Sequence, residues 1–119
     1  MFAVMGMTFY RSGSGEPLVL VHGVGSRWQA WSPVLASLAA HHDVVAVDLP
    51  GFGRSAPPAD DRYTVGAHAR SVVRHLDASG RGPVHLFGNS LGGAVSARIA
   101  ADRPDLVRTL TLVSPALPN

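Results

Sequence analysis

Residues 87–93, FGNSLGG, place a serine between glycines where a short apolar run gives way to a helix-like pattern. Gly88-Asn89-Ser90-Leu91-Gly92 matches G-x-S-x-G, the pattern of a nucleophilic serine on a tight strand-to-helix turn. Glycines at 88 and 92 remove the side chains that would collide when the strand and the helix approach closely. The alternative is a glycine-rich turn with a capping serine. The strand–turn–helix context favours the nucleophile.

A second glycine-rich stretch, His22-Gly23-Val24-Gly25, follows the apolar run LVLVH. When a serine attacks a carbonyl group, negative charge develops on the carbonyl oxygen, and backbone N–H groups can stabilise it. We expect one such N–H group from Leu91, directly after the serine, and the other from Val24. The residues expected to contact the substrate are His22, Gly23, Gly25 and Asn89.

The six histidines are candidates for a general base. His22 is the nearest in sequence to a predicted site element. We interpret it as structural, with a ring that hydrogen-bonds to the backbone and holds the loop. The same structural interpretation applies to the others, which fall on predicted helix faces, strand positions or turns: His41, His42, His68, His75 and His85.

Composition excludes several other classes of protein. The chain has 119 residues, enough for one domain, and no cysteine, so disulfides and thiolate metal sites are excluded. It has no lysine, which a P-loop requires, and residues 23–28 lack the third glycine of a dinucleotide-binding fingerprint. Its ten basic residues are scattered arginines, which does not indicate a nucleic-acid surface. Neither a signal peptide nor a membrane span is recognisable, so we expect a cytoplasmic protein with no membrane contact.

Apolar runs alternate with helical patterns along the chain. Residues 7–10 are expected to form one strand of an entry hairpin, with 11–17 as its turn. Further strands are expected at 18–22, 43–48, 84–87 and 106–113, and helices at 27–40, 64–78 and 91–101. This order predicts an α/β fold: a single domain over 1–119 with a mostly parallel sheet and helices on both faces. Ligands bind such sheets beyond the carboxyl ends of the strands, where HGVG, DLPGFG and GNSLGG all follow.

With these stretches in place, the sequence resembles the amino-terminal half of an α/β-hydrolase-fold enzyme. The matching segments are 15–31, 48–55 and 84–116, in family order. The resemblance implies Ser90 as nucleophile, the Val24 and Leu91 amides as the oxyanion hole, and no cofactor or metal. It also implies that Asp48 shapes turns and is not a catalyst.

The resemblance bears on the reaction as well. Relatives that cleave epoxides or carbon–halogen bonds carry aspartate at the nucleophile position, so Ser90 argues against those activities. Asn89 is similar to the residue in relatives that cleave esters or the carbon–carbon bonds of diketone-like compounds. The implied partner is a small-molecule ester or related carbonyl substrate.

The catalytic triad of the family runs serine, acid, histidine along the chain. After Ser90 the acids are Asp102 and Asp105, at the wrong end of the sheet, and no histidine follows His85. We therefore expect a truncated sequence whose triad acid and histidine are missing. Two alternatives stay open: an inactive fragment that pairs with another chain through an exposed edge strand at 109–113, and a cofactor-free lyase or haloperoxidase-like relative on the same scaffold.

Overall fold

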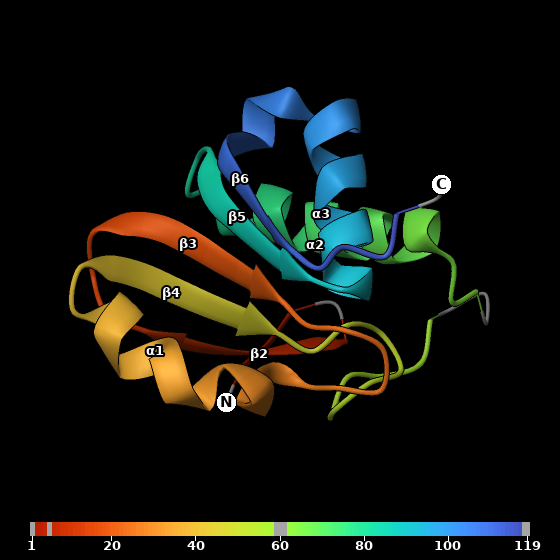
Figure 1. Ribbon diagram of the computed structural model, residues 1–119, viewed down its shortest axis with the longest axis horizontal. Helices are drawn as coiled ribbons and strands as arrows, with labels where there is room; N and C mark the ends of the chain where they lie inside the picture. Colours follow the sequence, from red (N-terminus) through yellow and green to blue (C-terminus); the bar gives the residue numbers. More distant parts are fainter. Residues whose placement is uncertain (1, 5, 59–61, 118–119) are drawn as a thin grey trace.

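The computed structural model describes residues 2–4, 6–58 and 62–117. Its framework is a six-stranded sheet with the strand order β1-β2-β4-β3-β5-β6 (Figure 1). The neighbouring pairs β4/β3, β3/β5 and β5/β6 are parallel, whereas β1/β2 and β2/β4 are antiparallel. The strands are β1 (Phe2–Val4), β2 (Met7–Ser12), β3 (Glu16–Val21), β4 (His42–Val47), β5 (Val84–Asn89) and β6 (Val107–Val113).

The parallel strands confirm the strands predicted from the apolar runs. In β3 and β4 the runs LVLV and VVAV are buried on both faces, as expected of a sheet covered on two sides. The carboxyl ends of β3 and β4 point the same way in Figure 1, and β5 runs parallel to β3. The segments that begin at His22, Asp48 and Ser90 therefore emerge from one edge of the sheet.

The predicted entry hairpin is wrong in its pairing. β2 does not pair with β3, because β4 lies between them, and the antiparallel hairpin partner of β2 is β1. Residues 13–15 instead carry the chain past the start of β4. Gly13 has φ +87°, and a Cβ there would collide with the backbone carbonyls of Ala39 and His42. The alternation in residues 7–10 indicated a strand but carried no information about its partner.

Helices cover both faces of the sheet, as predicted. The segment expected as one helix at 27–40 divides into a 3₁₀ turn, η1 (Trp28–Trp31), and α1 (Ser32–Ala39), with Pro33 in the first turn of α1. α1 packs on one face of the sheet. The other face is covered by α2 (Val65–Ser79) and α3 (Leu91–Asp102), which is followed by η2 (Pro104–Leu106) (Figure 1).

The buried face of α2 contains two histidines, His68 and His75. Neither ring has a hydrogen-bond partner within the described part of the chain. The His75 ring packs edge-on against Phe9, with ring centroids 4.7 Å apart. Burial lowers the pKa of His75 from 6.5 to about 4 and also lowers the pKa of His68. Both histidines are therefore neutral core residues at pH 7.

His75 predicts an acid-sensitive fold. Above pH 6.5 the imidazole is neutral in both the folded and the unfolded chain. As the pH falls toward 4 only the unfolded chain binds the proton, so the fold loses about 3 kcal/mol of stability through this group. His75→Leu should flatten the pH dependence of the free energy of unfolding, measured by urea denaturation between pH 7 and 4. The exposed control His41→Leu should leave it unchanged, and an equal slope in parent and His75→Leu would contradict the prediction.

Candidate active site

Ser90 lies between β5 and α3 in a backbone conformation that few non-glycine residues adopt. Its φ is 55° and its ψ is −117°, and such strain persists only where surrounding structure enforces it. The Ser90 amide donates to the Val113 carbonyl (3.0 Å), and the Ser90 carbonyl accepts from the amides of Ala116 (3.0 Å) and Gly93 (2.9 Å). The end of β6 and the first turn of α3 thus fix the serine from two sides.

The glycines around Ser90 allow the predicted close approach of strand and helix. A Cβ on Gly88 would collide with the Gly92 carbonyl, and a Cβ on Gly92 would collide with the backbone carbonyls of Val21 and His22. Both glycines are buried against backbone, which cannot move aside as the end of a side chain can. The turn therefore depends on glycine at both positions.

The His22 ring joins two loops at the same edge of the sheet. The Leu49 amide donates to His22 Nε2 (2.9 Å), so the proton resides on Nδ1, which donates to the Gly23 carbonyl (2.7 Å). The side chain is 1% exposed, and burial lowers the pKa of His22. With both nitrogens occupied, the ring holds backbone in place, in agreement with the structural interpretation of this residue.

The loop after His22 passes directly against the serine. A Cβ on Gly23 would lie 3.2 Å from Ser90 Cβ and 3.6 Å from Ser90 Oγ, and Gly25 adopts φ +68°. The Val24 side chain is 71% exposed. Within the described residues the amides of Val24 and Leu91 donate to no backbone carbonyl. The assignment of these two amides to an oxyanion hole stays a prediction.

The carboxylate of Asp48 holds three segments together. It accepts hydrogen bonds from Thr8 Oγ1 (2.7 Å), the Trp28 amide (2.7 Å) and the Arg54 amide (3.2 Å). Asp48 is 1% exposed, and Gly53 lies so close that a Cβ there would collide with the carboxylate. Both carboxylate oxygens of Asp48 are thus engaged in shaping the loops. That Asp48 is not a catalyst stays a prediction.

Two cavities open beside these loops. The smaller, about 70 Å³, lies next to Ser90 and is lined by His22, Gly23, Asn89, Ser26, Ala30 and Trp31. The larger, about 600 Å³, shares Ser26 and Ala30 with it and extends to Arg27, Gln29, Phe52 and the glycines 25, 51 and 53. The sequence predicted His22, Gly23, Gly25 and Asn89 as substrate contacts, and all four line one of these cavities. It did not predict the polar lining by Ser26, Arg27 and Gln29, because nothing in their pattern distinguishes them from an ordinary loop.

Comparison with known proteins decides the family. The family model of the alpha/beta hydrolase fold matches residues 16–119. The chain belongs to the alpha/beta hydrolase family. In this member of the family, Trp28 lines neither of the two cavities described above. It stacks on Tyr10 at 4.6 Å and lines a separate groove between β2 and α1.

The chain is similar to longer proteins, several of which are named hydrolases. The chain is 33% identical over 106 residues to the (E)-2-((N-methylformamido)methylene)succinate hydrolase of Acinetobacter baylyi, covering 89% of this chain and 40% of that protein. It is 38% identical over 109 residues to a soluble epoxide hydrolase of Corynebacterium sp., and the match covers 90% of this chain and 37% of that protein. The crystal structure of a membrane phospholipase A, a bacterial virulence factor, superposes on this chain with a TM-score of 0.88 at 38% identity. The match covers 92% of this chain and 36% of the phospholipase chain. The chain thus spans about two fifths of the length of these relatives.

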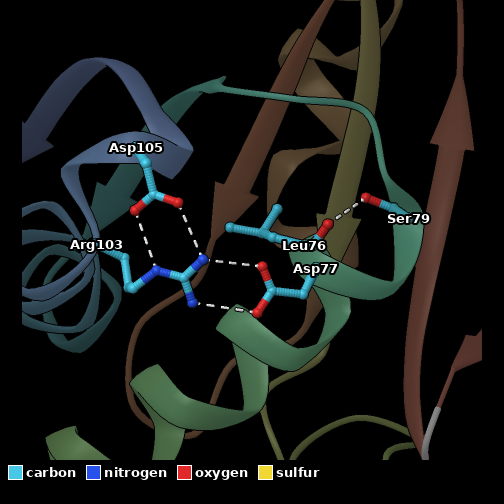
Figure 2. Close-up of polar contacts among 5 residues, drawn as sticks. All are labelled: Leu76, Asp77, Ser79, Arg103 and Asp105. Carbon is cyan, nitrogen blue, oxygen red and sulfur yellow. Dashed lines mark hydrogen bonds and ion pairs between the residues drawn. The ribbon is translucent and has the colours of Figure 1, made fainter.

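The acids that follow Ser90 in the chain lie away from the serine. α3 has 12 residues and is therefore about 18 Å long, and Asp102 and Asp105 follow at its far end. Figure 2 shows Asp105 paired with Arg103, which also binds Asp77; the Arg103 Nη2–Oδ distances are 3.0 and 3.1 Å. Asp102 pairs with Arg98 (2.7 Å). The structure therefore brings Ser90, Gly23 and Asn89 together and leaves both acids in surface ion pairs.

The described residues contain neither a candidate membrane span nor a candidate metal site. None of their helices has the length and apolar character to cross a membrane. In the same part of the chain no three histidine, aspartate or glutamate side chains are grouped closely enough to hold a metal ion.

The role of Asp48 can be measured through stability. Asp48→Asn removes the charge and turns one acceptor oxygen into an NH₂ group that faces hydrogen-bond donors. We expect the free energy of unfolding to fall by about 2–3 kcal/mol, measured by urea denaturation at pH 7. Asp102→Asn, at an exposed ion pair, should change it by less than about 1 kcal/mol. Equal effects in the two variants would show that the Asp48 carboxylate does not hold the loops together.

Proposed function

We propose that this alpha/beta hydrolase cleaves an ester or a related carbonyl substrate with Ser90 as its nucleophile. The observation that supports the proposal best is the enforced positive φ of Ser90 at the carboxyl end of β5, directly before α3. A serine in this conformation presents its hydroxyl away from the sheet, and the first turn of the helix brings N–H groups and a favourable dipole close to it.

In the proposed reaction Ser90 Oγ attacks the carbonyl carbon while a base takes the hydroxyl proton. The electron pair of the C=O bond moves to oxygen, where the Val24 and Leu91 amides stabilise it. Collapse of this intermediate expels the leaving group with a proton, and water then hydrolyses the acyl-serine. The base and the acid that orients it are proposed to come from outside these 119 residues, since loss of the base from a serine triad costs about 10⁶-fold in turnover.

The identity of the nucleophile limits the class of substrate more than the names of the relatives do. One relative is a soluble epoxide hydrolase, but the argument from Ser90, a serine where such enzymes carry aspartate, still favours a carbonyl substrate. A cofactor-free lyase or haloperoxidase-like reaction on the same scaffold would also begin at Ser90, and analysis of the products separates it from hydrolysis. The cytoplasmic location stays a prediction.

Ser90→Ala tests the proposal in the protein expressed from its own gene. Hydrolysis of short p-nitrophenyl esters should fall by at least about 10³-fold, and intact-protein mass spectrometry should detect an acyl adduct in the parent alone. Ser79→Ala, at the end of α2 and far from the cavities, is the matched serine control and should retain parental activity. Parental rates in Ser90→Ala would refute the role of this serine.

The outer edge of β6 supports a second, non-catalytic candidate, pairing between two copies of the chain. β6 is the last strand of the described sheet, its residues are largely exposed, and Leu110 is 38% exposed. An unpaired apolar edge favours strand-to-strand association, and a lysine on the edge opposes it. Sedimentation of the 119-residue chain should show dimers that Leu110→Lys weakens at least about tenfold, whereas the exposed α1 control Val34→Lys should not. A monomeric parent would exclude this candidate.

A further inference from the structure

Among the described residues that line the larger cavity, one side chain is charged, that of Arg27. Arg27 comes just before η1, on the same loop that passes the serine, and is exposed. Its neighbours in the lining include the polar side chains of Ser26 and Gln29, and Phe52 lies across the cavity. A cation in an otherwise neutral, partly polar cavity gives that cavity a preference for anions.

The cavity with Arg27 adjoins the smaller cavity at the nucleophile, because the two share part of their lining. Ser26 and Ala30 line both cavities, and the smaller one also contacts Gly23 and Asn89, the immediate neighbours of Ser90. A substrate whose carbonyl group lies at Ser90 can therefore extend past Ser26 toward Arg27. With a volume of about 600 Å³, the larger cavity has room for a short chain that ends in a polar group.

Arg27 has no counter-ion within the described part of the protein, in contrast to the arginines that stabilise the fold. The described carboxylates are all engaged elsewhere. Both oxygens of Asp48 accept the hydrogen bonds given above. The other carboxylates form the ion pairs Glu16–His85, Asp43 with Arg11 and Arg81, Asp102–Arg98, and Asp77 and Asp105 with Arg103. Within the described residues, the Arg27 guanidinium is thus left without a carboxylate partner.

We propose that Arg27 is a specificity-determining residue that binds a free carboxylate of the substrate, so that the preferred substrates are esters or related carbonyl compounds that carry a second, ionised carboxyl group. The proposal rests on the proposed function for the position of the reacting carbonyl. A guanidinium matches a carboxylate with two parallel N–H···O bonds, which are stronger than bonds between neutral groups and depend on the planar fork that lysine lacks.

The test compares two esters that differ in one carboxylate, mono-p-nitrophenyl adipate and p-nitrophenyl hexanoate, in the protein expressed from its own gene. The parent should prefer the adipate in kcat/KM. Arg27→Gln should lower the adipate-to-hexanoate ratio at least about tenfold, and Arg27→Lys should restore part of it. Arg54→Gln removes a charge from the neighbouring loop without touching the cavity lining, and should change the ratio less than about twofold.

Two results of this kinetic comparison would overturn the proposal: an unchanged ratio in Arg27→Gln, or an equal loss in Arg54→Gln, which would indicate general charge steering. Binding to the Ser90→Ala variant separates this proposal from the proposed function. There monomethyl adipate should bind more tightly than dimethyl adipate, and the added change Arg27→Gln should abolish the difference. If Ser90→Ala keeps full hydrolysis, the nucleophile assignment fails while this binding comparison still decides the role of Arg27. Equal binding of the two esters in Ser90→Ala would overturn it.

Discussion

Backbone-to-backbone contact around Ser90 is the constraint on which the rest of the site depends. Gly92 packs on the carbonyls of Val21 and His22, where β3 ends, and Gly88 packs on the carbonyl of Gly92. The first turn of α3 therefore touches two neighbouring strands without intervening side chains. This contact brings the loop after β3 close to Ser90, so that Gly23 packs against the serine side chain. A methyl group at either glycine would separate the nucleophile from the loop expected to stabilise its oxyanion.

Once the strands and α3 are in contact, two buried polar side chains position the loops above them. The neutral His22 ring links the Gly23 carbonyl to the Leu49 amide, so the loops after β3 and β4 are held together. The carboxylate of Asp48 adds β2, η1 and the Arg54 turn. Buried polar groups are costly unless they are fully hydrogen-bonded. Both ring nitrogens of His22 and both carboxylate oxygens of Asp48 are hydrogen-bonded, so burial of these side chains stabilises the loop geometry.

The sequence was sufficient for those features that local pattern determines. Runs such as LVLV predicted buried parallel strands because residues buried on both faces are continuously apolar, and G-x-S-x-G predicted the turn at Ser90 because its steric demand is local. Features that depend on distant contacts were not predictable. The pairing of β2 with β4 depends on the path of the chain at Gly13. The core positions of His68 and His75 depend on what packs against α2, and the cavity lining of Ser26 and Arg27 depends on a loop some 25 residues later.

The strain at Ser90 connects the end of β6 to the chemistry. A non-glycine residue in such a conformation costs about 1–3 kcal/mol, and α3 alone does not enforce it. The additional restraint comes from Val113 and Ala116, whose backbone groups bond the Ser90 amide and carbonyl, and from Pro115, which packs on Gly93. The segment after β6 is thus part of the nucleophile's support although it supplies no catalytic group. Because β6 reaches the sheet only through its pairing with β5, anything that stabilises or covers β6 also stabilises the backbone geometry of Ser90.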